Sequence, residues 1–98
     1  MNNFKETVVK LGLCNEVDFC ELRILDQLKV AMLFLAESEH YSKRFPGYEE
    51  QLKILYIQHR NVTGKWRAKA EIRAKQLLEP LLPVIQRKIE EEKNEIEN

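Results

Sequence analysis

Basic residues gather in one short segment, residues 59–76, which reads HRNVTGKWRAKAEIRAKQ. It holds six lysines and arginines around the only tryptophan of the chain, and Glu71 is its one acidic residue. At 100° per residue, three of the basic side chains fall on one side of a helix: Lys65, Lys69 and Arg73. Such a row can contact phosphates and displace counterions, which gives salt-sensitive binding to nucleic acid.

This hypothesis assigns nucleic-acid binding to five residues: Lys53, Arg60, Lys65, Lys69 and Arg73. The alternative interpretation is a solvated helix face, or one covered by acidic residues of the same chain or of a partner subunit. The chain has 16 lysines and arginines against 16 aspartates and glutamates, so its overall charge gives no reason for non-specific binding. A helix-turn-helix motif fits poorly, because polar residues precede Gly64 and small alanines follow it.

A leucine-rich corner, LLEPLLPVI, follows the basic segment. Its prolines, Pro80 and Pro83, predict a packed corner with Pro83 in the first turn of a last helix, and this outweighs a minimal proline-rich ligand pattern. Apolar residues beyond those needed for the core would serve a protein partner. We therefore expect a partner-binding set made of Trp66, Leu77, Leu81 and Leu82.

Residues that could support catalysis or bind a metal form no pattern. The chain has no glycine-rich phosphate loop, and Cys14 and Cys20 are six apart without a nearby histidine, so we expect buried, reduced thiols. Glu37 and His40 resemble half of a carboxylate-bridged metal site whose second half is absent. We predict no enzyme, no metal, no cofactor and no small-molecule substrate. His59 recurs with apolar residues at helical spacing. We expect it to be either a core histidine or a histidine that faces its own copy across a dimer axis.

The amino terminus lacks the basic and apolar stretches of a secretory leader. The most apolar run, residues 30–36, is about a third of the length that crosses a bilayer. The sequence therefore predicts a soluble, cytoplasmic chain without membrane contact.

Helices must position these residues, because glycines and prolines are few and the apolar residues recur at helical spacing. Asn3 and Glu6 predict the start of a short first helix, which Gly12 ends. Asp18 predicts the start of a second helix that is apolar on every side around residues 30–36. The break at residues 44–47 ends it.

A seam with heptad spacing follows, at Tyr48, Leu52, Leu55, His59, Val62 and Trp66. It favours one long helix over about 48–78, because a single glycine inside a helix costs only about 1 kcal/mol. The alternative is two helices joined by a tight turn at 62–64. The acidic carboxyl end opposes the helix dipole and is expected to fray over about 92–98.

Together these elements predict an all-α fold, a small helical bundle of one domain, 1–98. It has a buried second helix antiparallel to a long third helix, or to a helical hairpin, and a kinked fourth helix. Its apolar surface predicts a homodimer. We expect a non-enzymatic protein–protein interaction or regulatory protein, and as the alternative a nucleic-acid-binding accessory protein.

Overall fold

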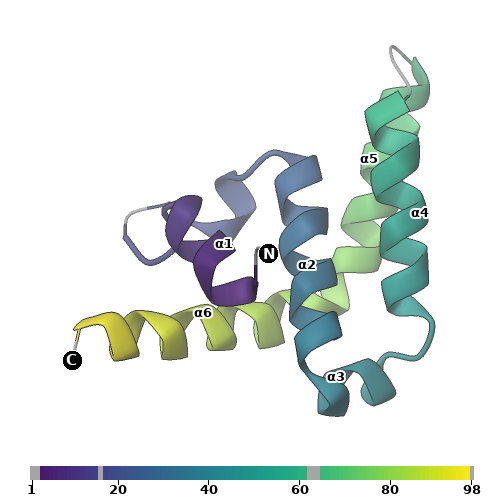
Figure 1. The fold of residues 1–98 in the computed structure, drawn as a ribbon. Helices are drawn as coiled ribbons and strands as arrows, with labels where there is room; N and C mark the ends of the chain where they lie inside the picture. The colour runs from purple at the N-terminus through teal and green to yellow at the C-terminus, as the bar shows by residue number, and fades with distance from the viewer. Residues whose placement is uncertain (1–2, 16, 62–64, 98) are drawn as a thin grey trace.

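The computed structural model describes residues 3–15, 17–61 and 65–97, with side chains for 3–15, 17–61 and 68–95. Within these residues the chain forms α-helices and two 3₁₀ turns and no strand, so the predicted all-α helical bundle is confirmed (Figure 1). In chain order the elements are α1 (Phe4–Lys10), η1 (Phe19–Glu21), α2 (Ile24–Glu37), α3 (Glu39–Arg44), α4 (Tyr48–Asn61), α5 (Lys65–Leu78), η2 (Glu79–Leu81) and α6 (Leu82–Glu97).

Both ends of α1 follow the sequence prediction. The side chain of Asn3 accepts a hydrogen bond from the backbone N–H of Glu6 at 2.8 Å. At the other end Gly12 has φ of +79°, and the N–H groups of Gly12 and Leu13 donate to the carbonyls of Val9 and Val8. These two bonds define a Schellman motif, which favours glycine at the left-handed position.

The start of α2 was predicted too early. Asp18 makes no side-chain cap, and the residues after it form only the short turn η1 before α2 begins at Ile24. The amide of Gln27 explains this geometry, because it donates to the backbone carbonyls of Leu22 at 2.9 Å and Cys20 at 3.4 Å. In a helix that began earlier, these two carbonyls would accept hydrogen bonds from backbone N–H groups. The Gln27 side chain satisfies them instead.

The second helix is the centre of the core, as its all-round apolar character predicted. α2 packs against α1, α4 and α5, and its fully buried side chains include Leu28, Val30 and Ala31. It ends at Glu37, earlier than expected, because Ser38 both ends α2 and begins α3. The Ser38 hydroxyl accepts from the N–H of Tyr41 at 3.5 Å, so the segment expected to continue α2 is a separate short helix.

α4 and α5 form an antiparallel hairpin, and the single long helix is wrong. The two helices lie side by side in Figure 1 and contact each other along their length. On α4 the seam prediction holds, since Leu52, Leu55 and His59 are buried. Among the described side chains of α5 the buried ones are Ala74 and Leu78, whereas Ala70, which continues the spacing of the seam beyond Trp66, is half-buried. The conformation of Gly64 lies outside the described residues.

The proline corner turns the chain into α6. Pro83 lies in the first turn of α6 as predicted, and the corner is filled by buried Leu78, Leu81 and Ile85, while both prolines are exposed. α6 continues to Glu97, through most of the segment for which fraying was predicted. Fraying of this end in solution stays a prediction. Among the helices of the described part, none has the length and apolar composition needed to span a bilayer.

Candidate functional site

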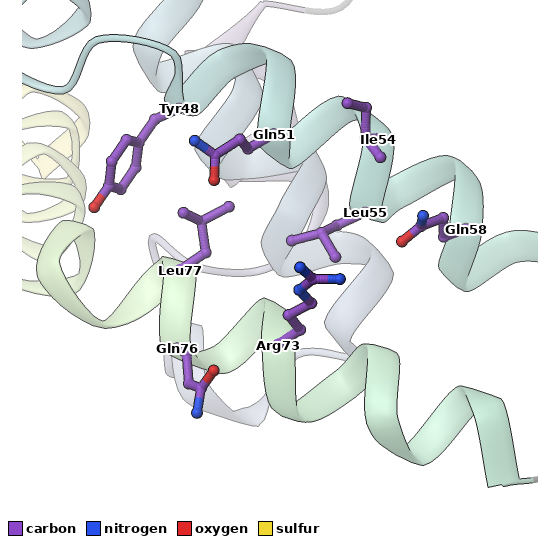
Figure 2. Close-up of a pocket in the computed structure, with 8 residues that line it drawn as sticks. All are labelled: Tyr48, Gln51, Ile54, Leu55, Gln58, Arg73, Gln76 and Leu77. Atoms are coloured by element: carbon purple, nitrogen blue, oxygen red, sulfur yellow. The ribbon is translucent and has the colours of Figure 1, made fainter.

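A groove runs between α4 and α5 on the outer side of the hairpin, with a volume of about 530 Å³. Figure 2 shows Leu55 of α4 directed toward α5, and Leu77 and Arg73 of α5 directed toward α4. The lining residues are Tyr48, Gln51, Ile54, Leu55, Gln58, Arg73, Gln76 and Leu77. Apolar side chains, three amides and one guanidinium therefore share a single surface.

Helical spacing places these residues together. On α4, the positions 48, 51, 55 and 58 follow the three-and-four rhythm that keeps side chains on one face. On α5, Arg73, Gln76 and Leu77 are neighbours by the same rule. Leu55 is buried and Leu77 half-buried, so the groove has an apolar base, while the amides and Arg73 are exposed at its rim.

Exposed isoleucines flank this groove. Ile54 is 48% exposed and Ile57 49% exposed on α4, and Ile72 is 59% exposed on α5. Ile72 lies one helical turn from Gln76, and Ile57 lies three residues from Ile54, so helical spacing places each next to a rim residue of the groove. We call the groove-lining residues together with Ile57 and Ile72 the hairpin face. Apolar surface of this kind, rimmed by polar groups, is typical of protein interaction sites.

The predicted nucleic-acid residues do not form one surface. Arg73 lines the groove, and Lys69 is exposed one turn before it on the same side of α5. Lys53 instead lines a smaller hollow between α2 and α4, of about 240 Å³, with residues that include Lys29 and Glu49. The guanidinium of Arg60 lies 5.9 Å from the ring centre of Tyr56. The described members of the set thus lie on two sides of α4, and the side chain of Lys65 lies outside the described residues.

The predicted partner-binding set also divides. Leu77 lines the groove, and Leu82 is half-buried next to the core. Leu81 is fully buried, so it belongs to the protein's own core rather than to its surface. Its place at the end of η2 turns it inward, whereas Leu82 begins α6. The side chain of Trp66 lies outside the described residues, and its role stays a prediction.

The histidines and cysteines lie apart. His59 is buried at its seam position, and His40 is exposed with its ring edge on Tyr41. The described residues contain no group of three or more potential metal ligands. Cys14 is half-buried, but Cys20 is exposed on η1 rather than buried as we expected, because the neighbouring Phe19 takes the inward position of that turn.

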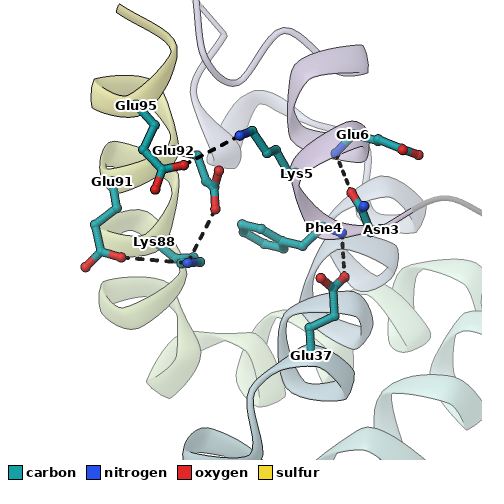
Figure 3. Close-up of polar contacts among 9 residues, drawn as sticks. All are labelled: Asn3, Phe4, Lys5, Glu6, Glu37, Lys88, Glu91, Glu92 and Glu95. Carbon is teal, nitrogen blue, oxygen red and sulfur yellow. Dashed lines mark hydrogen bonds and ion pairs between the residues drawn. The ribbon is translucent and has the colours of Figure 1, made fainter. Parts of the chain in front are cut away.

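A second polar cluster joins α1 to α6, as Figure 3 shows. Lys5 pairs with Glu95 at 3.5 Å, and Lys88 contacts Glu92 at 3.3 Å and Glu91 at 3.8 Å. Glu92 is only 7% exposed. Partial burial, and then the negative charge of Glu92, raise the pKa of the Cys14 thiol. The Lys5–Glu95 pair crosses from α1 to α6, whereas the two Lys88 contacts lie within α6, and we assign the cluster a structural role.

Comparison with known proteins supplies no relative for this arrangement. No protein family matches the chain, and no curated protein and no solved structure shows detectable similarity to it. The groove must therefore be interpreted from its own chemistry.

Sequence reasoning missed most of the groove. Tyr48 was assigned to the seam, and no role was given to Ile54 or to the three glutamines, Gln51, Gln58 and Gln76. One signal was present: Ile54 and Ile57 are apolar residues of α4 that lie off the seam. Apolar positions outside a helix's own packing face indicate surface that another chain can cover.

Proposed function

We propose that this chain is a small non-enzymatic, cytoplasmic interaction protein that binds another protein through the hairpin face. The observation that supports this proposal is the groove between α4 and α5, which has an apolar base and is lined by exposed Ile54, with exposed Ile57 and Ile72 one helical turn from its rim residues. A helix pair with a groove is a common way to bind an amphipathic segment of a partner. A regulatory role follows from such binding, since a chain of 98 residues can compete for or cover a surface of its partner.

Nucleic-acid binding is the second candidate, and the exposed side chains of Lys69 and Arg73 on one side of α5 favour it. It predicts an affinity that falls steeply with salt, whereas apolar docking changes little. The two candidates therefore separate in one salt titration with labelled double-stranded DNA.

The experiment that tests the proposed function is site-specific photo-crosslinking in the cells that make the protein. A photo-reactive amino acid at Ile54 or Gln76 should capture a defined protein band. The same probe at Val9 should not, and Val9 is a matched control because it is 49% exposed but lies on α1, outside the hairpin face.

Substitutions give the second test of the same site. With the photo-reactive residue at Gln76, Ile54→Glu should abolish the captured band and Val9→Glu should leave it intact, with circular dichroism showing that both variants fold. If the two variants retain the band equally, the hairpin face is not the binding site. Absence of any captured band with the probe in the otherwise wild-type chain, together with strong, salt-sensitive DNA binding, would support the second candidate instead.

A further inference from the structure

We propose that the partner segment is an amphipathic helix of another protein, apolar on one face and acidic along one edge, with Arg73 as its ionic anchor. This inference rests on the proposed function and adds the chemistry of the partner. It follows from the length, the apolar base and the charge of the groove.

The length of the groove suits a short helix. Its lining residues on α4 extend over the eleven residues from Tyr48 to Gln58, which span about 15 Å, or about three helical turns. A third helix lying along a helical hairpin buries residues at spacings of three, four and seven. The apolar base formed by Leu55 and Leu77 would receive those anchors, and Ile54 and Ile72 would cover their flanks.

The charge of the groove selects acidic residues. Arg73 is the one charged side chain among the lining residues, and Lys69 follows the same side of α5 one turn away. A guanidinium can bind a carboxylate through two parallel hydrogen bonds. The amides of Gln51, Gln58 and Gln76 donate and accept equally well and impose no preference of their own. A partner helix with glutamates or aspartates on the edge facing α5 would complement this surface.

A second copy of the chain fits less well. A two-fold axis passing through the groove would bring Arg73 and Lys69 toward their own copies, and like charges placed together disfavour association. The acidic end of α6 is no better suited, because its apolar residues Ile85 and Ile89 are already buried within the same molecule. Nucleic acid would leave the exposed isoleucines beside the groove without apolar contacts.

The test uses three designed peptides of about sixteen residues that share one leucine stripe at helical spacing. The acidic peptide has glutamates along one edge of the stripe, the neutral peptide has glutamines there, and the basic peptide has lysines. Fluorescence anisotropy measures their binding to the full chain at about 50 and 500 mM salt, since screening separates ionic from apolar contributions. We expect the acidic peptide to bind about three-fold more tightly than the neutral one at low salt, through the ionic contact with Arg73.

Charge reversal of Arg73 is the decisive variant. Arg73→Glu should remove the advantage of the acidic peptide, favour the basic peptide and leave binding of the neutral peptide unchanged. Arg87→Glu is the matched control, because it makes the same charge change on an exposed residue of α6. It should leave the order of the three peptides as in the wild type.

The other outcomes are distinguishable. Equal binding of the acidic and neutral peptides, lost in Ile54→Glu, would overturn the acidic preference while the proposed function stands. Absence of binding by all three peptides, with capture from Ile54 retained in cells, would overturn the helical partner alone. A doubled mass in sedimentation that Ile54→Glu abolishes would identify a second copy as the occupant, and DNA binding abolished by Arg73→Glu would identify nucleic acid; either result would overturn this inference.

Discussion

The carboxylate of Glu37 accepts a hydrogen bond from the backbone N–H of Phe4 at 2.5 Å, so the last residue of α2 caps the first turn of α1 (Figure 3). The first N–H groups of a helix lack partners within it, and negative charge beside them is favourable. This bond joins two residues that are 33 positions apart in the sequence. It therefore fixes how α1 sits on the core.

Removing the Glu37 carboxylate should loosen α1. Because hydrogen bonds to charged groups contribute about 1.5–3 kcal/mol and neutral ones about half of that, Glu37→Gln should lower the free energy of unfolding by about 1 kcal/mol and Glu37→Ala by about 2 kcal/mol. Urea unfolding followed by circular dichroism measures both. The control is Glu39→Gln, which breaks only the exposed pair with Lys43 and should cost less than about 0.5 kcal/mol. Equal losses for Glu37 and Glu39 would contradict the capping role.

Alanine at Gly12 should destabilise the protein more than alanine at Gly47. Both glycines have left-handed backbone angles, φ of +79° and +80°, for which an L side chain costs about 1–2 kcal/mol. A Cβ at Gly12 would also lie 3.2 Å from Cγ2 of Val17, whereas at Gly47 the nearest atom is the end of the Gln51 side chain at 3.8 Å. Thermal unfolding of the two variants compares them directly. Equal melting temperatures for the two variants would show that Val17 moves aside without cost.

Leucine in place of Glu92 should preserve or raise stability. Glu92 continues the buried row of Ile85 and Ile89 on α6, and its Oε2 atom is buried with no hydrogen-bond partner among the described residues. Replacing a buried, incompletely paired charge by an apolar side chain of similar size is often neutral or stabilising by about 1–4 kcal/mol. Calorimetry of Glu92→Leu should show an unchanged or higher melting temperature. A fall of several degrees would mean that the contact with Lys88 contributes more than the burial of the carboxylate costs.

The two cysteines should differ in how fast they react with an alkylating reagent. The raised pKa of Cys14 keeps its thiol protonated in the fold, so this group stabilises the fold below its unfolded pKa and the contribution is lost as pH rises through the folded value. Alkylation by iodoacetamide, followed by mass spectrometry between about pH 7 and pH 10, should modify exposed Cys20 before Cys14. Unfolding in urea should remove the difference between them. Faster reaction at Cys14 in the folded protein would contradict its protection.

Sequence patterns predicted those parts of the fold that depend on local chemistry. Asn3 and Gly12 set the ends of α1 because capping involves backbone groups only a few residues away. The seam on α4 was correct for the same reason, since Leu52 and Leu55 face inward at helical spacing. Periodicity does not show where a chain reverses direction. The helical spacing of apolar residues continues from α4 to Trp66 and Ala70. The same sequence pattern is therefore expected for a hairpin and for one long helix.

The groove could not be predicted because it depends on that reversal. Leu55 and Leu77 are 22 positions apart, and only the antiparallel pairing of α4 and α5 brings them to one surface. The adjacent leucines Leu81 and Leu82 show the same limit. They are the same residue type at neighbouring positions, yet the turn at η2 buries Leu81 completely and leaves Leu82 half-buried.

The amide of Gln27, which fixes the turn η1 to the first turn of α2, has a consequence for the order of folding. Its contact with Cys20 closes seven residues of chain, whereas the contact between Glu37 and Phe4 closes 33. Loop-closure entropy makes the longer closure less favourable by about 1.4 kcal/mol. The turn should therefore form together with α2 early in folding, before α1 docks on α2.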